Sequence, residues 1–172
     1  MSSSLENATG TEAVSELGIM GAIEATGKRL SGRHHTNGEW TTAILSDLHR
    51  YADGLGLRVW TTPNAVDSTT NKWLYDFVIS EGPTPQDIAR VLVAVECAWD
   101  CPFCKIKCDF LKLVQSRSTL RVMIFQSNDV EKTTNGLIEI VEVSKMSVPG
   151  DQYLFVRWNG QDGFTFTSHT KS

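Results

Sequence analysis

The stretch Val93-Ala-Val-Glu96-Cys97-Ala-Trp-Asp-Cys101-Pro-Phe-Cys104-Lys-Ile-Lys-Cys108-Asp-Phe-Leu-Lys112-Leu-Val114 carries the main fold signal of this chain. Residues 91–95 are all apolar, which is typical of a strand buried on both faces. Pro102 suits the first turn of a helix, where its missing N–H costs nothing. Behind it, Ile106 and Phe110 recur at helical spacing. The stretch therefore predicts a buried strand over 90–98, followed by a helix that covers one face of its sheet.

Further elements are predicted on both sides of this unit. Those before it are a helix within 11–30, a helix over 39–54, and strands over 57–61 and 73–79. Those after it are a strand over 120–125, a helix over 130–146, and a hairpin of 153–158 with 164–167. The core stripe expected of the first helix is Val14, Leu17, Met20 and Ile23. Residues 1–10 are expected to be disordered and 11–172 to form a single α/β domain with a mixed sheet.

Composition narrows the class of protein. The 172 residues are 41% hydrophobic and 21% charged, as in a globular chain with an ordinary core. No apolar run approaches the roughly 20 residues of a membrane-spanning helix, and the start lacks a secretion signal, so we expect a cytoplasmic protein. The net charge of −4 counts mildly against tight, nonspecific binding of nucleic acid. The sequence does not fix the oligomeric state, and a homodimer is compatible with it.

Two carboxylates are expected to meet at neighbouring strand ends. Strand alternation puts Asp76 on the face of Val78, and Glu96 on the face of Ala94. If the two strands are neighbours, the carboxylates converge and attract a divalent cation such as Mg²⁺, which would activate a water for attack on a phosphoryl group. The competing interpretation is structural, because a strand-end carboxylate commonly serves as a cap or a salt-bridge partner.

The order helix, three strands, helix, strand, with Asp76 in Leu-Tyr-Asp-Phe and Glu96 in Val-Ala-Val-Glu, resembles the PD-(D/E)xK or restriction-endonuclease-like superfamily. The resemblance covers about residues 39–126, with the last helix and the hairpin as an appendix. It implies a metal-dependent nuclease, a hydrolase of DNA or RNA, in which Asp76 and Glu96 bind Mg²⁺. It also implies that Glu39, at the start of the 39–54 helix, assists them.

One position departs from the family pattern. The family's lysine lies two residues after the glutamate, and that position here is Ala98. Some relatives move the lysine to the following helix, where Lys112 would take its role of stabilising the developing charge. A solvated helix face is the simpler interpretation of Lys112 and its polar neighbours. The predicted function is therefore a magnesium-dependent nucleic-acid phosphodiesterase or an inactive descendant of one.

All four cysteines of the chain fall within twelve positions: Cys97, Cys101, Cys104 and Cys108. Four thiolates can bind zinc, although this spacing is not that of two Cys-x2-Cys knuckles. Because Cys97 points away from Glu96, a zinc site would be structural, and plain core packing is the competing interpretation. Trp99 is expected to pack beneath the following helix. The alternative function is a non-enzymatic binding or interaction protein with a structural four-cysteine zinc site or a cysteine core.

Overall fold

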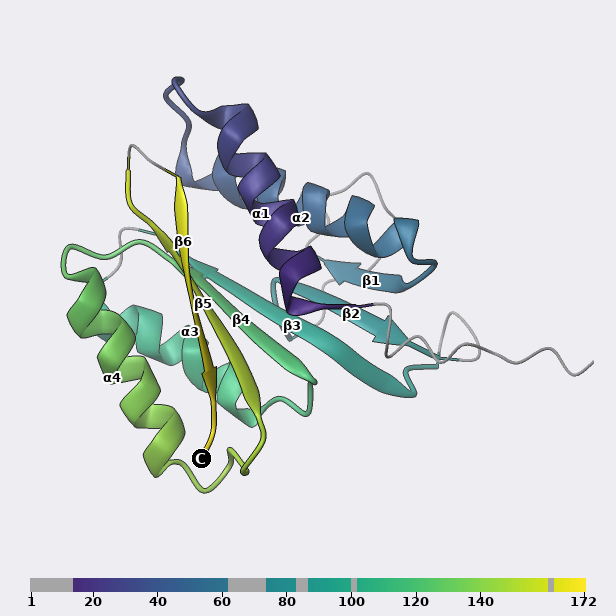
Figure 1. Ribbon diagram of the computed structural model, residues 1–172, viewed down its shortest axis with the longest axis vertical. Helices are drawn as coiled ribbons and strands as arrows, with labels where there is room; N and C mark the ends of the chain where they lie inside the picture. The colour runs from purple at the N-terminus through teal and green to yellow at the C-terminus, as the bar shows by residue number, and fades with distance from the viewer. Residues whose placement is uncertain (1–13, 62–73, 83–86, 100–101, 161–162) are drawn as a thin grey trace, which may run out of the picture.

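The computed structural model describes residues 14–61, 74–82, 87–99, 102–160 and 163–172. The predicted disorder of residues 1–10 lies outside this part of the chain. Within it, four helices and six strands follow one another (Figure 1). They are α1 (Glu16–Leu30), α2 (Asn37–Gly54), β1 (Arg58–Thr61), β2 (Phe77–Glu81), β3 (Arg90–Ala98), α3 (Phe103–Gln115), β4 (Leu120–Phe125), α4 (Val130–Val143), β5 (Gln152–Trp158) and β6 (Phe164–Thr170).

The strands form one mixed sheet in the order β1-β2-β3-β4-β5-β6. β1, β2 and β3 are antiparallel neighbours, β3, β4 and β5 run parallel, and β6 returns antiparallel to β5. Helices α1 and α2 cover one face of the sheet, and α3 and α4 cover the other (Figure 1). The α/β class and the mixed sheet are thus confirmed. None of the described helices is long and apolar enough to cross a membrane.

The two C-terminal strands are more than an appendix to this fold. β5 pairs with β4 over six residues, and its residues 153–156 are buried. Tyr153 and Phe155 pack under α3 and α4, while Leu154 and Val156 pack on the α1/α2 side. The predicted hairpin of 153–158 with 164–167 is confirmed, and its first strand, β5, completes both apolar layers of the sheet.

Local sequence explains where several helices begin and end. α2 starts in a capping box, in which Thr36 and Glu39 satisfy each other's free backbone N–H groups. Asp129 caps α4 through a bond from the Lys132 N–H, and α4 ends at Val143, three residues earlier than predicted. Pro102 is the residue before α3 rather than part of its first turn, with an extended backbone.

Three residues of the predicted stripe, Val14, Met20 and Ile23, pack toward the core from α1 and the residues just before it, but Leu17 does not. Leu17 is 77% exposed, whereas Ile19, Ile23, Thr26 and Gly27 are buried. A Cβ on Gly27 would lie 3.2 Å from the Phe164 ring, so a small residue there allows α1 to approach the start of β6 closely. The contact with Phe164 and the packing against α2 decide which face of α1 is buried. The spacing of apolar residues within α1 contains no information about either contact.

A register shift between β2 and β3 changes the alternation expected in β3. Ile79 pairs with Val93, but Ser80 pairs with Val91, so Leu92 is left over as a bulge. Leu92 and Val93 consequently pack on the same α1/α2 side, contrary to strict alternation. Beyond the bulge the alternation holds, with Ala94 and Ala98 on the α3 side.

Candidate active site

Asp76 and Glu96 lie near each other where β2 begins and β3 ends, and the charge of Asp76 acts on Glu96. The register pairs Val78 with Ala94 and Phe77 with Val95, and one step further brings Asp76 opposite Glu96. Asp76 precedes β2 instead of lying within it, and its Oδ2 accepts a bond of 3.0 Å from the Cys97 N–H. The Thr61 hydroxyl donates to the Asp76 carbonyl at 3.2 Å, which fixes this segment to the end of β1.

The Glu96 carboxyl group is almost fully buried. The residue is 2% exposed and lies on the sheet face that α3 covers, next to Ala94 and Ala98. Burial, and then the charge of Asp76, raise the pKa of Glu96 to about 8, although Lys112 acts in the opposite direction. A carboxyl group with this pKa is in a place that disfavours its negative charge, which is common where a protein binds a cation or performs proton chemistry.

Lys112 reaches this carboxyl group from α3. Its Nζ lies 3.3 Å from both Oε1 and Oε2 of Glu96, and 2.8 Å from Oδ1 of Asp109. Lys112 sits beside the inward stripe of α3 that includes Leu113, so its stem follows the helix surface and its ammonium reaches the end of β3. Burial alone would lower the pKa of Lys112, but the bond with Asp109 and the charge of Glu96 raise it.

Ala98 occupies the position at which the resembled family has its strand lysine. It is 3% exposed and packs in the apolar layer against α3. The positive charge at this site comes instead from Lys112 on the helix above. The hypothesis that Lys112 reaches the acidic pair therefore agrees with the observed contact.

Two residues of this neighbourhood were missed in the sequence. Asp109 holds Lys112 at three residues' separation, a helical spacing that could have indicated the pair. Tyr75 is 6% exposed, and its hydroxyl donates to the Lys112 carbonyl at 3.5 Å. Burial and then the charge of Glu96 raise the pKa of Tyr75. No pattern in the sequence pointed to Tyr75, since its role depends on the approach of α3.

Glu39 has a local role in the structure. Its carboxylate accepts bonds from the Thr36 N–H at 2.7 Å and from the Thr36 hydroxyl at 2.9 Å. These bonds lower the pKa of Glu39, with smaller contributions from His35 and His34. The contacts that define Glu39 are those of a helix cap, and its predicted assistance to Asp76 and Glu96 stays a prediction.

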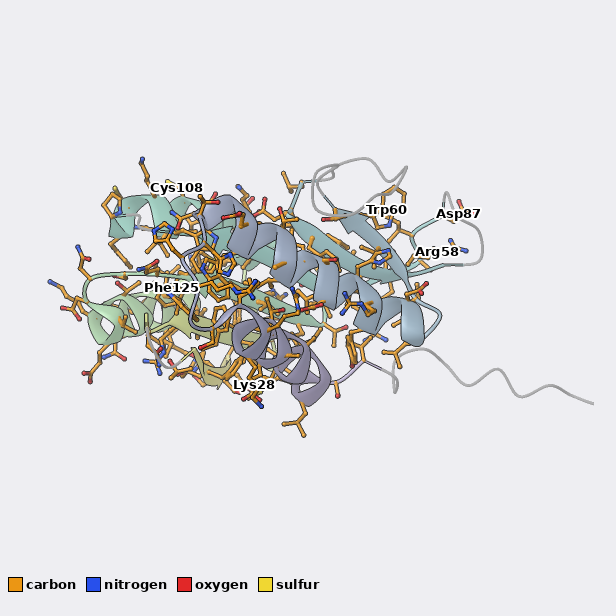
Figure 2. All side chains as sticks on the ribbon, turned by 90° about the horizontal axis from the view of Figure 1, so that it is seen from above. Lys28, Arg58, Trp60, Asp87, Cys108 and Phe125 are labelled. Atoms are coloured by element: carbon orange, nitrogen blue, oxygen red, sulfur yellow. The ribbon has the colours of Figure 1, made fainter. Side chains whose placement is uncertain are left out.

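The cysteines lie on different surfaces. Cys97 is half-buried against the α1/α2 side of the sheet, as its alternation with Glu96 predicted. Cys104 and Cys108 are exposed on α3, and Figure 2 labels Cys108 on that helix. Cys101 lies outside the described residues. Across the described ranges, no three or more His, Cys, Asp or Glu side chains are grouped so that they could bind a metal ion.

Trp99 corrects another expectation. Its indole Nε1–H donates to the Thr41 hydroxyl of α2 at 2.7 Å, and the ring packs on the α1/α2 side. It therefore lies on the face opposite α3, because the alternation of β3 continues one residue past the strand. The contact ties the first turns of α2 to the end of β3.

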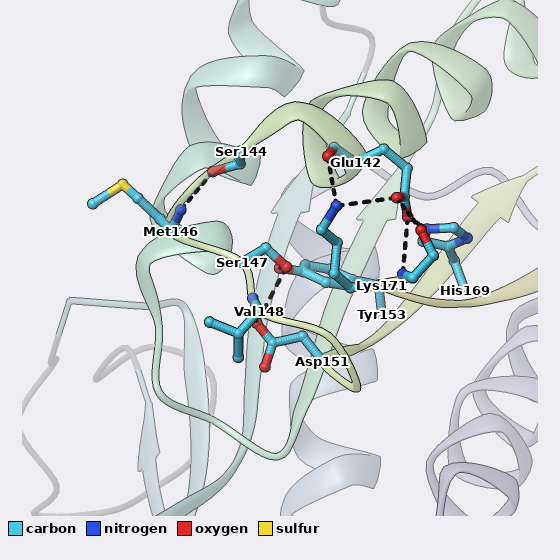
Figure 3. Close-up of polar contacts among 10 residues, drawn as sticks. Glu142, Ser144, Met146, Ser147, Val148, Asp151, Tyr153, His169 and Lys171 are labelled. Carbon is cyan, nitrogen blue, oxygen red and sulfur yellow. Dashed lines mark hydrogen bonds and ion pairs between the residues drawn. The ribbon is translucent and has the colours of Figure 1, made fainter.

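A separate charged cluster fastens the C-terminus to α4 (Figure 3). Glu142 accepts a bond of 3.0 Å from Lys171 Nζ and lies 2.8 Å from His169 Nε2. Bonds from Ser172, Lys171 and His169 lower the pKa of Glu142 to about 2. This cluster stabilises the ionised carboxylate, whereas the surroundings of Glu96 destabilise it. We therefore take the Glu96 cluster as the candidate active site.

Comparison with known proteins gave no match: neither a family model, nor a curated protein, nor a solved structure is significantly similar to this chain.

Proposed function

We propose that this chain is a magnesium-dependent nucleic-acid phosphodiesterase built on a restriction-endonuclease-like core. The observation that carries the proposal is the contact of Lys112 with the buried Glu96, at 3.3 Å from both carboxylate oxygens. A lysine beside an acidic pair is what the chemistry requires, and here α3 supplies it where β3 has Ala98. DNA and RNA are both candidate substrates.

The order of elements supports the proposed core. From Asn37 to Phe125 the chain runs α2, β1, β2, β3, α3 and β4. The first three strands form an antiparallel meander, and β4 is parallel to β3 after the crossover through α3. This is the succession of helix, three strands, helix and strand on which the resemblance rests.

Asp76 and Glu96 are the residues that would bind Mg²⁺. The fit rests on the Glu96 carboxyl group, which is 2% exposed, because a divalent cation would offset the repulsion that raises its pKa. Magnesium commonly uses only one or two protein carboxylates and keeps several waters. When bound, it would polarise a phosphoryl oxygen and lower the pKa of the attacking water.

Lys112 would act on the substrate side of this pair. Because the charges around it keep its pKa high, the ammonium stays charged at neutral pH. A fixed positive charge beside the reacting group stabilises the negative charge that develops on the phosphoryl oxygens. Asp109 serves as a positioning residue, since its 2.8 Å contact holds the ammonium near the end of β3.

The direct test is a cleavage assay with Mg²⁺ on plasmid DNA, single-stranded DNA and structured RNA. We expect cleavage by the wild type, and at least a hundredfold loss in Asp76→Asn, Glu96→Gln and Lys112→Met, since loss of one charge-stabilising group costs about 10²–10³ in rate. Glu81→Gln, at the far end of β2, and Lys105→Met, exposed on α3, are matched controls that should cleave normally. Glu39→Gln in the same series tests the predicted assistance of Glu39.

A measurement of Mg²⁺ binding distinguishes a metal site that has lost activity from a wrongly assigned metal site. Mg²⁺ should raise the midpoint of thermal unfolding in the wild type, but not in Asp76→Asn. Stabilisation by Mg²⁺ without cleavage of any substrate would identify an inactive descendant of a nuclease. Cleavage that survives in Glu96→Gln would contradict the proposed site. Metal analysis under reducing conditions tests the alternative, since one equivalent of zinc per chain would support a four-cysteine site.

A further inference from the structure

The end of α1, the loop after it and the last turns of α2 carry exposed cationic side chains: Lys28, Arg29, Arg33 and Arg50, here called the basic patch. Residues 28–35 contain three cationic residues and no carboxylate, although the whole chain has a net charge of −4. The remainder of the chain is therefore more acidic than the total suggests. Such a local concentration of positive charge marks a surface for a polyanion.

A buried aspartate holds two of these arginines in place. Asp47 is 5% exposed, and it accepts bonds of 2.5 Å from Arg29 Nη2 and 2.6 Å from Arg50 Nη1. The arginine side chains themselves are 50% and 72% exposed. Burial would raise the pKa of Asp47, but bonds from Thr26 and Arg29 and the two guanidinium charges lower it. Each guanidinium uses one of its five N–H donors on Asp47, and its exposed part can bind another anion.

The two arginines border a shallow hollow of about 530 Å³. Its lining also includes Thr42 and Ser46, together with Thr36, whose hydroxyl already donates to Glu39. Guanidinium groups and hydroxyls are the donors that proteins most often direct at phosphate oxygens. Glu39 is on the rim, but its carboxylate is bonded to Thr36. The hollow thus brings two exposed guanidinium groups and hydroxyl-bearing residues to one place on the surface.

The end of α1 and the candidate active site lie at the same edge of the sheet, in opposite helix layers, whereas Arg50 lies toward the far end of α2, next to Tyr51, which contacts the start of α1. Gly27 faces the Phe164 ring at the start of β6, and the Trp40 ring packs, tilted, against Trp158 at the end of β5, with centroids 4.4 Å apart. Thr41 holds Trp99 just after β3. The end of α1, where Figure 2 labels Lys28, therefore shares the edge at which Asp76 and Glu96 meet.

We propose that the basic patch binds the phosphodiester backbone of a nucleic acid that crosses this edge of the sheet toward Asp76 and Glu96. The inference rests on the proposed function and adds the surface that would hold the substrate. It also accounts for an acidic protein acting on a polyanion, because attraction is confined to one edge while the remaining surface repels nonproductive contacts.

The test measures binding without cleavage, in EDTA, by fluorescence anisotropy of a short labelled DNA duplex, a single strand and an RNA hairpin over a range of salt. In Lys28→Gln/Arg33→Gln we expect affinity about tenfold weaker at low salt, and a salt slope reduced by about one unit for each lost phosphate contact. Arg50→Gln should weaken binding in the same direction. The matched control is Arg117→Gln/Lys145→Gln, which removes two exposed charges at the opposite edge and should bind like the wild type.

The outcomes distinguish this inference from the proposed function. Equal weakening in the control pair, or an unchanged salt slope in the patch variant, would overturn the inference. Binding of the patch to anionic lipid vesicles but to none of the three nucleic acids would overturn it as well. If the patch binds nucleic acid and the wild type cleaves nothing with Mg²⁺, the proposed phosphodiesterase fails while the binding surface stands.

Discussion

Two buried ionisable residues, Glu96 and Arg121, lie on neighbouring strands under the same helix, and the protein stabilises the charge of Arg121 but not that of Glu96. Arg121 pairs with Ala94, two residues before Glu96, and is 3% exposed. Its Nε donates to the Leu113 carbonyl at 3.2 Å, and its Nη2 donates to the Ser116 carbonyl at 2.8 Å. Both residues therefore belong to the α3-covered layer, one toward each end of it.

Arg121 is compensated by a network that extends to β5. Its Nη2 lies 3.2 Å from Asp151 Oδ1, and its guanidinium lies 5.1 Å from the centre of the Tyr153 ring. Tyr153 donates to Ser147, and Ser147 donates to Asp151, as Figure 3 shows. The charge of Arg121 joins α3, β4 and the loop before β5, which is a structural role.

Among the residues that the structure describes, no comparable network surrounds Glu96. Its carboxyl group meets one ammonium, shared with Asp109, and a second negative charge from Asp76. The comparison teaches that burial alone does not identify a functional charge. A buried charge with several fixed partners stabilises the fold, whereas one left without enough positive charge is available for a ligand.

The largest effect on stability is expected for a substitution of Arg121. Arg121→Met leaves Asp151 without its charged partner and removes the side-chain donor to two carbonyl groups, so we expect a loss of about 3 kcal/mol in the free energy of unfolding. Urea unfolding followed by circular dichroism measures it. Arg117→Met, exposed in the turn before β4, is the control and should change stability by less than about 0.5 kcal/mol. An equally small loss of stability in Arg121→Met would contradict the structural role of Arg121.

An intermediate effect with a definite pH dependence is expected for Glu96→Gln. Between pH 4.5 and about 8 the folded protein holds a proton that the unfolded chain has released. Rising pH therefore lowers the stability of the wild type through this range, by at most about 1.4 kcal/mol per pH unit. Glu96→Gln has no carboxyl group to titrate here. The difference in free energy of unfolding between Glu96→Gln and the wild type should therefore shift in favour of the variant from pH 5 to pH 8. Parallel stability curves for the two proteins would show that Glu96 titrates normally.

The smallest effect is expected for Asp109→Asn. This residue is about one-third exposed, and its pair with Lys112 is a helix-surface contact, so stability should change by less than about 0.5 kcal/mol. In this variant the Lys112 ammonium pairs with Glu96 alone, and the negative charge of Asp109 is gone. The pKa of Glu96 should therefore fall. Carboxyl titration by NMR measures this shift. A rise in the pKa of Glu96 would mean that Asp109 is needed to hold Lys112 in contact with it.

Much of the sheet was predictable because its signals are local. β3, α3 and β4 follow from uninterrupted apolar runs and from one helical stripe, and the alternation beyond the bulge predicted that Asp76 and Glu96 share a face. The bulge at Leu92 was not predictable, since it depends on the register with β2. The buried face of α1 and the position of Trp99 were likewise decided by partners distant in sequence: Phe164 for the first and Thr41 for the second.

The sequence by itself determined the α/β class, the strand–helix unit from Val93 to Val114, and the residues from which an acidic site could be made. Only the tertiary structure decided that Lys112 contacts Glu96, that Glu39 caps a helix, and that Arg121 is a structural charge. The reason is that periodicity reports which face of an element is apolar. The charge state and role of a polar side chain depend on burial and on the groups that other elements bring within hydrogen-bonding distance.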